Sequence, residues 1–236
     1  MMKDRRFPRF VRSIELFTNE TEVQVNVLES DKPVARHFFD WCAERMAGGG
    51  AGSLDYAAAG NLFRVSHHSF FQVNRFLLEK LVETALEGAE GESATDLYAG
   101  VGLFSLELAK RFGNVTAVEA TGSAIEDLRF NTERAGAKLT PVKRSVEDYL
   151  AGLTEAPDFV LADPPRAGLG KRAVADLIRL KPRQITIVAC DPATLARDLA
   201  PLVASGYGIA KTTLVDLFPH TFHMETVVRL VLGSQG

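Results

Sequence analysis

The chain contains little cysteine: Cys42 and Cys190 are its two thiols among 236 residues. Two cysteines so far apart exclude a disulfide framework, a CxxC redox pair and a four-thiolate metal site. No stretch approaches the roughly 18 consecutive apolar residues of a membrane-spanning helix, and the charged N-terminus has no apolar run behind it. We therefore expect a protein of the reducing cytoplasm, neither secreted nor embedded in a membrane.

The chain also lacks a strong net charge. Its 27 basic and 30 acidic side chains leave −3, which argues against gripping a polyanion with the whole surface, because such affinity comes from Lys and Arg displacing counterions. Any nucleic-acid contact should be local. Residues 1–12 are one candidate, because basic and aromatic side chains alternate there: Lys3, Arg5, Arg6, Arg9, Arg12, Phe7 and Phe10. A solvated tail is the alternative explanation.

Residues 1–74 are expected to form a small β-rich α+β lobe. Apolar residues alternate between Ser13 and Leu28, which predicts a hairpin with its turn at Thr18–Glu20. A helix should follow, because the next apolar residues share one helical face: Val34, Phe38, Trp41 and Cys42. A glycine run at 48–52 then breaks the chain, and a short strand is predicted near Asn61–Val65.

Residues 75–236 have the pattern of an α/β domain. Short apolar runs alternate with helical patterns, which is typical of βα units that build a parallel sheet. The predicted strands are Ala94–Tyr98, Val115–Val118, Pro141–Val142, Phe159–Ala162 and Ile185–Ala189. Two further strands, Ile209–Val215 and Thr226–Leu232, have no helix between them, so we expect an antiparallel last strand and a Rossmann-like, mostly parallel sheet.

Helix boundaries are predicted from local signals. Ser123 and Glu126 form a capping-box pattern at the start of a helix that Gly136 should end. A helix over Leu103–Phe112 should likewise stop at Gly113. Pro201 should kink or end the helix that follows Ala193.

A glycine-containing loop marks a cofactor site. Gly100 and Gly102 follow the first strand of the α/β region, where residues without side chains let the backbone approach a ligand. Glu119 ends the next strand, where a carboxylate can accept hydrogen bonds from both ribose hydroxyls. NAD would also fit this acid, but a dinucleotide fingerprint needs glycine where Ser105 stands. S-adenosylmethionine, which has no pyrophosphate, fits better.

Three further residues follow strands at the ligand-binding edge of the sheet. Asp163 is held by two prolines, and the next residue, Arg166, suits a phosphate or carboxylate where amino-methylating enzymes carry an aromatic residue. Cys190 precedes a helix that Pro192 begins, so the helix dipole should lower the thiol pKa and make it a nucleophile. A rigid turn at Asp163 and a buried core cysteine at 190 are the structural alternatives.

Glu225 lies at the start of the last strand and is a candidate base. His220 and His223 have the i, i+3 spacing of metal ligands but no acidic or thiol partner at ligand spacing, and His67 and His68 are similar. We therefore predict no metal site, and interpret the histidines near Glu225 as loop residues that form hydrogen bonds.

Taken together, these motifs resemble the uracil-C5 RNA methyltransferase family, which makes 5-methyluridine in tRNA and rRNA and has a class I methyltransferase fold. The resemblance covers about residues 62–236. It rests on six ordered motifs: SFFQVN from Ser69, DLYAGVGLF from Asp96, VEA from Val118, DPPRAGL from Asp163, ACDPATLARDL from Ala189 and FPHTFHMET from Phe218.

The resemblance implies a site and a chemistry. Gln72, Tyr98, Glu119 and Asp163 would contact S-adenosylmethionine. Cys190 would add to carbon 6 of uracil so that carbon 5 can take the methyl group, and Glu225 would remove the carbon 5 proton.

The sequence departs from the family pattern at Leu103, Ser145 and Asp191. An anionic Asp191 beside Cys190 should raise the thiol pKa. Family members usually carry an N-terminal OB-like RNA-binding domain that is not found here, so RNA choice is expected to depend on residues 1–61, the basic N-terminus or a partner.

Two other functions fit the same sequence. The first is methylation of another substrate, cytosine C5 or a small molecule, which the small net charge favours. The second is a non-catalytic relative that binds RNA or the cofactor. The presence of both Cys190 and Glu225 argues against this second alternative.

Overall fold

The structure is a computed structural model that describes residues 4–5, 7–46, 52–72, 74–221 and 223–233. Lys3, Arg6 and residues 48–51 of the glycine run lie outside the described residues, so the predictions made for them have no structural counterpart. Within the described ranges, none of the helices has the length and apolar character needed to cross a bilayer.

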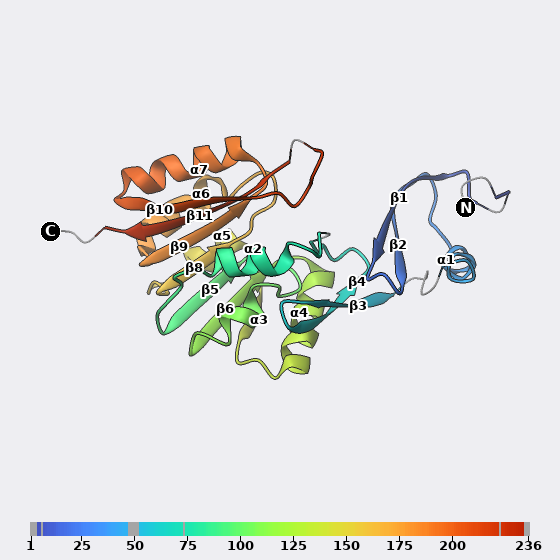
Figure 1. The fold of residues 1–236 in the computed structure, drawn as a ribbon, viewed down its shortest axis with the longest axis horizontal. Helices are drawn as coiled ribbons and strands as arrows, with labels where there is room; N and C mark the ends of the chain where they lie inside the picture. Colours follow the sequence, from blue (N-terminus) through green and yellow to red (C-terminus); the bar gives the residue numbers. More distant parts are fainter. Residues whose placement is uncertain (1–3, 6, 47–51, 73, 222, 234–236) are drawn as a thin grey trace.

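A seven-stranded sheet forms the body of the molecule (Figure 1). Its strand order is β10-β11-β9-β8-β5-β6-β7. The strands are β5 (Ser93–Leu97), β6 (Asn114–Glu119), β7 (Thr140–Lys143), β8 (Phe159–Ala162), β9 (Gln184–Ala189), β10 (Tyr207–Val215) and β11 (Glu225–Leu232). β5 to β9 pair in parallel, whereas β11 runs antiparallel to both β9 and β10, which confirms the predicted antiparallel last strand.

Helices cover both faces of this sheet, as expected for parallel strands that are buried on both sides. They are α2 (Leu78–Ala85), α3 (Ser105–Leu108), α4 (Gly122–Ala135), α5 (Val146–Ala151), α6 (Gly170–Leu180) and α7 (Pro192–Ala204). One apolar cluster joins α2 and α3 to one face, and a second joins α5, α6 and α7 to the other. β5 lies between these layers at the point where the strand order reverses, since β6 pairs on one side of it and β8 on the other.

Several predicted helix boundaries are wrong. α4 begins at Gly122 with Thr121 as its N-cap, so Ser123 lies inside the helix and caps nothing, and Glu126 pairs with Arg129 instead. The helix predicted over Leu103–Phe112 is a single short helix, α3. The prediction for Gly136 is confirmed, because this residue ends α4 in the left-handed conformation with φ of 60°.

Pro201 does not end its helix, because α7 continues through it to Ala204. Proline costs about 3 kcal/mol in a helix interior. Leu195 and Leu202, on either side of Pro201, are buried against the sheet. Tertiary packing of this apolar face therefore outweighs the local penalty.

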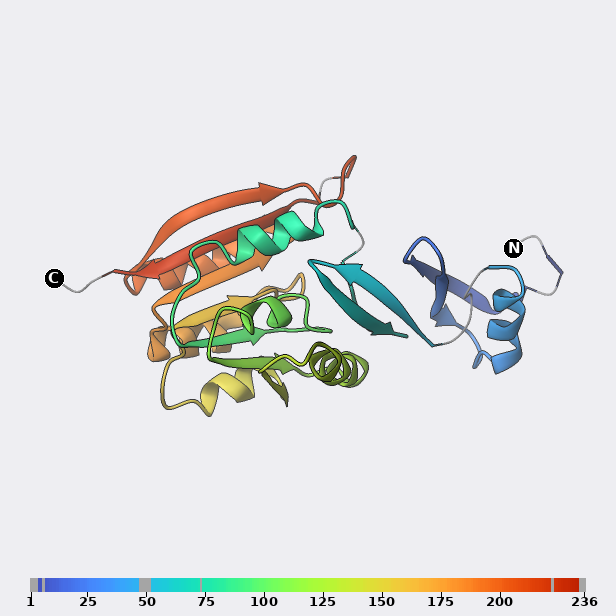
Figure 2. The same ribbon diagram turned by 60° about the horizontal axis from the view of Figure 1, so that its bottom comes forward.

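A smaller unit lies at one end of the molecule, and we call it the terminal lobe (Figures 1 and 2). It comprises β1 (Val11–Thr18), β2 (Val23–Ser30) and α1 (Arg36–Ala43), which confirms the predicted hairpin and helix. Its core is a small cluster around Val25, Phe38, Trp41 and Cys42. Cys42 is fully buried there, as expected for a structural cysteine.

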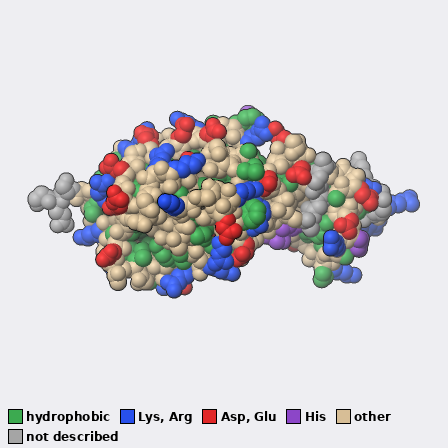
Figure 3. Space-filling model, turned by 90° about the horizontal axis from the view of Figure 1, so that it is seen from below, with side chains coloured by type: hydrophobic (Ala, Val, Ile, Leu, Met, Phe, Trp, Pro, Cys, Tyr) green, Lys and Arg blue, Asp and Glu red, His purple; other side chains and the backbone are tan. Residues whose placement is uncertain are grey.

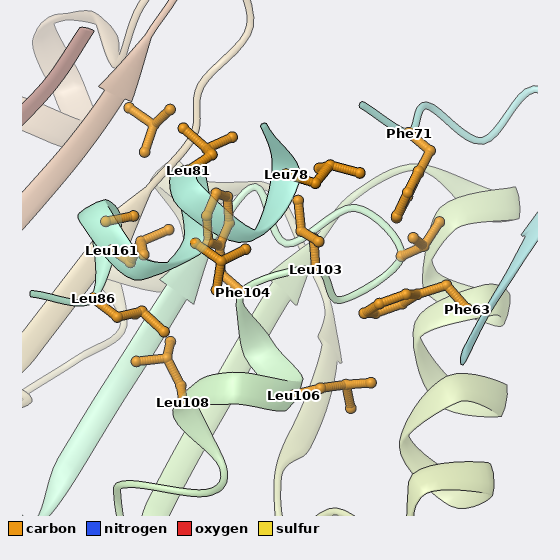
Figure 4. Close-up of a cluster of buried hydrophobic side chains, with 14 of the residues drawn as sticks. Phe63, Phe71, Leu78, Leu81, Leu86, Leu103, Phe104, Leu106, Leu108 and Leu161 are labelled. Atoms are coloured by element: carbon orange, nitrogen blue, oxygen red, sulfur yellow. The ribbon is translucent and has the colours of Figure 1, made fainter. Parts of the chain in front are cut away.

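A second hairpin, β3 (Ser53–Ala58) and β4 (Asn61–Ser66), lies between the terminal lobe and the body (Figure 2). The apolar pattern of the sequence predicts β4 but not β3. Phe63 of β4 and Phe71 point into the same buried cluster as Leu103 and Leu78 of the body (Figure 4). The hairpin therefore shares the core of the large sheet; the division of the chain at residue 74 stays a prediction.

Candidate active site

A cavity of about 660 Å³ opens at the carboxyl ends of the parallel strands. Eight of the nine residues predicted for the site line it: Gln72, Tyr98, Gly100, Glu119, Asp163, Arg166, Cys190 and Glu225. They come together because parallel strands place their carboxyl ends at one edge. β11 is antiparallel, so its first residue, Glu225, lies at the same edge, and the pairing of Thr226 with Ala189 brings Glu225 beside Cys190.

The loop after β5 has a backbone that only certain residues tolerate. Gly100 and Gly102 have φ of 55° and 100°, and Tyr98 between β5 and this loop is held at 62°, a strained value for a residue with a side chain. A Cβ at Gly100 would point into open space, whereas one at Gly102 would lie 2.8 Å from Leu128 Cδ1. Gly102, the ninth predicted residue, is not among the residues that line the cavity; it allows close packing on α4.

Glu119 ties this loop to the end of β6. Its Oε2 accepts a hydrogen bond from the Gly100 amide at 2.9 Å, and its Oε1 accepts one from the Thr121 amide at 2.6 Å. Each carboxylate oxygen has a second lone pair. The carboxylate is therefore fixed in place by the backbone and can still accept hydrogen bonds from a ligand in the cavity.

Gln72 reaches the cavity from the segment that follows β4. Its side chain is buried, and its Oε1 has no hydrogen-bond partner among the described residues. A buried acceptor without a partner costs about 1–3 kcal/mol. A ligand that donates a hydrogen bond here would remove that cost.

Three buried carboxyl groups at this edge of the sheet have raised pKa values, and two of them, Asp163 and Glu225, line the cavity. Burial raises the pKa of Asp96 to about 7, although Ser105 donates a hydrogen bond to it. Burial, followed by the negative charge of Glu225, raises the pKa of Asp163 well above its usual value. Glu225 is 3% exposed, and burial raises its pKa as well. A cation bound in the cavity would stabilise the ionised form of each group.

Cys190 lies half-buried on the cavity wall, just before α7. Burial raises the pKa of its thiol, the charge of Glu225 raises it further, and the charge of Arg166 lowers it. The predicted lowering of the thiol pKa is therefore wrong: desolvation and the nearby carboxyl groups raise it.

Asp191 has a different role from the expected one. Its side chain caps α7 by accepting a hydrogen bond from the Thr194 amide at 2.8 Å. That bond lowers the pKa of the Asp191 carboxyl, and the carboxyls that raise the thiol pKa are those of Glu225 and Asp163. Aspartate thus serves here as an ordinary N-cap residue.

Several residues at the rim of the cavity were not predicted to belong to the site. His68, Phe70 and Phe218 line it, and the Phe70 side chain is 70% exposed. His223 lies 3.2 Å from the Arg166 guanidinium through its Nε2, which confirms its predicted role as a hydrogen-bonding loop residue. The SFFQ motif was the available signal for Phe70. Across the described parts of the chain, no three His, Cys, Asp or Glu side chains gather as metal ligands.

The strand order, the reversed last strand and a cavity at the switch point beside β5 together define the class I methyltransferase fold. A solved magnesium protoporphyrin IX methyltransferase of Synechocystis PCC 6803 shares this fold at 16% identity and a TM-score of 0.52, over 67% of this chain and 79% of that one.

More specific comparisons identify the family. The sequence model described as tRNA (Uracil-5-)-methyltransferase matches residues 52–232, so the chain belongs to that family. The solved tRNA (uracil-54, C5)-methyltransferase of Pyrococcus abyssi, in complex with S-adenosyl-L-homocysteine, is similar over 94% of this chain and 59% of its own, with 32% identity and a TM-score of 0.77.

Curated relatives agree. An "uncharacterized RNA methyltransferase" of Thermotoga maritima is 37% identical over 73% of this chain and 40% of its own length. Another, of Streptomyces avermitilis, is 40% identical over 76% of this chain and 43% of its own. The chain therefore spans less than half the length of these relatives.

Proposed function

We propose that this protein transfers a methyl group from S-adenosylmethionine to carbon 5 of a uridine in RNA, through a covalent bond between Cys190 and carbon 6 of the base. The observation that carries the proposal is that Cys190 and Glu225 face the same cavity as Glu119 and the Gly100 loop. A nucleophile, a base and a nucleoside-binding edge thus share one space. Family membership supports the substrate class.

The cavity fits S-adenosylmethionine. Glu119 can accept hydrogen bonds from the ribose hydroxyls, and the unpartnered Gln72 Oε1 can accept one from an ammonium group. The absent side chain at Gly100 leaves room for a ligand against the backbone. Burial raises the pKa values of Asp163 and Glu225 and so disfavours their ionised forms. A cationic ligand in the cavity would stabilise these ionised forms and would itself be stabilised by their negative charge. When bound, S-adenosylmethionine supplies an electrophilic methyl group on a sulfonium.

Cys190 would start the reaction. Carbon 5 of uracil is a poor nucleophile until a thiolate adds to carbon 6, which moves an electron pair onto the C5–C4–O4 system as an enolate. Carbon 5 would then bond to the methyl carbon while the bond from that carbon to the sulfonium sulfur breaks, so that a neutral thioether, S-adenosyl-L-homocysteine, is left. The charge of Arg166, which lowers the thiol pKa, favours the thiolate, and the guanidinium suits a phosphate of the RNA.

Glu225 would finish the reaction. Once carbon 5 carries the methyl group, its remaining proton must leave so that the C5–C6 double bond can re-form and the thiolate can depart. The strand pairing that sets Glu225 beside Cys190 suits it to accept this proton. Burial raises the pKa of Glu225, which makes its carboxylate a stronger base than an exposed one.

We propose tRNA as the first RNA to test and rRNA as the second, because the family and the Pyrococcus abyssi protein are described by tRNA methylation. Acidic and basic side chains are interspersed on the face shown in Figure 3, which is consistent with local rather than surface-wide contacts. The target base must leave its stack to enter the cavity.

The test is a covalent trap. The protein is incubated with S-adenosylmethionine and either tRNA or an rRNA fragment in which 5-fluorouridine replaces uridine; fluorine at carbon 5 blocks proton removal. We expect a denaturation-resistant complex with one methyl group per bound base, and none with Cys190→Ala. If neither RNA yields a complex while the protein still binds S-adenosylmethionine, the protein methylates another substrate or only binds, and the proposal is wrong.

A further inference from the structure

Helix α4 carries a buried carboxylate that the proposed chemistry does not use. Asp127 is 0% exposed, although it lies on a helix whose N-terminal end borders the cavity at Thr121 and Ala124. Burying a carboxylate is costly unless donors and positive charge surround it. Its partners therefore show which part of the chain it fixes.

The carboxylate of Asp127 accepts four hydrogen bonds from β4 and the turn that follows it. The Arg64 Nε donates to Oδ1 at 2.7 Å, and the Ser66 hydroxyl donates to the same oxygen at 2.6 Å. The Ser66 amide and the Ser69 hydroxyl each donate to Oδ2 at 2.7 Å. One carboxylate thus fastens the end of β4 and the turn after it to α4.

The segment fastened in this way forms a wall of the cavity. His68, Phe70 and Gln72 line the cavity. Phe71 lines it as well, and its ring packs on Tyr56 and Phe63 with ring centroids 5.0 and 5.5 Å apart; Phe63 and Phe71 are drawn in Figure 4. Two contacts therefore fix the chain just before Gln72: the hydrogen bond from the Ser69 hydroxyl to Asp127 and the packing of the Phe71 ring in the core.

The glycine loop, which also lines the cavity, is joined to the same helix. Asn131, one turn after Asp127, donates from Nδ2 to the Val101 carbonyl at 3.0 Å and to the Arg64 carbonyl at 3.1 Å. Its Oδ1 accepts from the Arg64 amide at 2.7 Å. Val101 belongs to the loop that contains Gly100. Helix α4 thus sets the distance between the Gln72 wall and the glycine loop.

Attachment of the hairpin to α4 does not itself require Asp127. Arg134 already joins the two elements through Asp55 at 2.7 Å and the Leu62 carbonyl at 2.5 Å. Phe63 and Val65 bury themselves in the core of the body. What Asp127 adds is control of the segment from Ser66 to Gln72.

We propose that Asp127 is a positioning residue for the cofactor: through Ser69 it holds Gln72 at the correct distance from the glycine loop. This inference rests on the proposed function, because it takes the cavity to bind S-adenosylmethionine. It assigns no reacting role to Asp127 and predicts an effect on cofactor affinity rather than on the chemical step.

The test uses Ser69→Ala, which removes one hydrogen bond and leaves the carboxylate with Arg64 and Ser66. Calorimetry with S-adenosyl-L-homocysteine should show a Kd raised roughly 5- to 10-fold, while kcat at saturating cofactor stays near wild type. Asp55→Asn is the matched control: it breaks the other tie between hairpin and helix, and should leave the Kd unchanged.

A double-mutant cycle separates positioning from general loosening. If Ser69 acts through Gln72, then Ser69→Ala should add no further loss of affinity in a Gln72→Ala background. Full additivity of the two losses, or an equal loss in Asp55→Asn, would overturn the proposal. Asp127→Asn changes all four hydrogen bonds and could destabilise the fold, so its thermal melt is measured first. If the variant melts at the wild-type temperature, its affinity for the cofactor should fall further than that of Ser69→Ala.

Hydrogen exchange distinguishes failure of this proposal from failure of the proposed function. Amides of residues 66–72 should exchange faster in Ser69→Ala than in Asp55→Asn, with or without ligand. If wild-type protein binds no cofactor, the proposed function fails and the positioning role fails with it, even where exchange shows the anchor. If wild-type binds and Ser69→Ala binds equally well, the positioning role alone is wrong.

Discussion

The terminal lobe and the body are stabilised by apolar cores of very different size. The body buries two large apolar clusters on the faces of one sheet, whereas the core of the lobe is a handful of residues around Phe38 and Trp41. Contacts with the second hairpin therefore add to the stability of the lobe. Phe17 of β1 stacks on Tyr56 of that hairpin with ring centroids 5.5 Å apart. Gln24 of β2 donates to the carbonyls of Gly52 and Val65.

The comparison teaches where function can reside. The described lining of the cavity comes from residues 68 onward, so the cavity belongs to the body and to the segment that follows β4. The lobe contacts that segment through Phe39, whose ring lies 5.4 Å from His67 by centroid, and histidine side chains lie at this junction in Figure 3. The lobe thus touches the segment that lines the cavity, although none of its described residues is part of that lining.

The two cysteines give the sharpest form of the comparison, since each region has one. Cys190→Ala should lower kcat for uridine methylation by a factor of about 10⁴ or more, because carbon 5 is then never activated. Cys42→Ala should leave kcat unchanged and weaken the lobe by roughly 1–2 kcal/mol. Tritium release from carbon 5 and thermal melts measure both, and comparable activity in the two variants would refute the covalent mechanism.

Glu225→Gln should slow turnover by about 10²- to 10⁴-fold, because proton removal follows methyl transfer. Addition and methylation would still occur, so ordinary RNA should accumulate as a methylated covalent complex visible on a denaturing gel. Arg229→Gln on the same strand is a control that should show no such complex. A variant that turns over slowly without accumulating the adduct would place the proton elsewhere.

Phe38→Ala should unfold the terminal lobe locally, with a cost of about 3–5 kcal/mol, and leave cofactor binding intact. Phe159→Ala makes a matched cavity in the body, where Phe159 is fully buried, and should abolish cofactor binding with the whole sheet. Hydrogen exchange in the β1–β2 and β5–β11 regions, with calorimetry, checks both. Loss of cofactor binding in Phe38→Ala would show that the two regions fold as one unit.

The smallest expected effect concerns the thiol. Because burial and Glu225 raise the pKa of Cys190, the thiolate fraction at neutral pH is small, and alkylation should quicken as pH rises. Arg166→Gln removes a charge that lowers this pKa, so the titration should move to higher pH and the rate at pH 7.5 should fall roughly 3- to 10-fold. Iodoacetamide rates in a Cys42→Ala background provide the measurement, and an unshifted profile would contradict the role of Arg166.

Local patterns predicted most of the architecture. The alternation of apolar runs with helical spacing located the strands of the large sheet, and the gap without a helix before Thr226 predicted the antiparallel last strand. Boundaries were harder to predict: Ser123 matches a capping box by sequence, but α4 begins earlier, with Thr121 at the N-cap position and the Thr121 amide donating to Glu119. β3 was not predicted because it directly follows the glycine run, and glycines in series indicate an interruption of regular secondary structure.

The sequence by itself determined which chemistry was available: a cysteine, a carboxylate and a glycine loop, each placed directly beside a strand. Only the tertiary structure decided that Asp127 should hold Ser69, since nothing in the spacing of an acid on a helix indicates its partners 58 residues earlier. It also decided the direction of the thiol pKa, because desolvation and the charges of Glu225 and Asp163 depend on distances through space. Covalent order fixes the periodicity of each element, whereas long-range contacts fix the surroundings of each side chain.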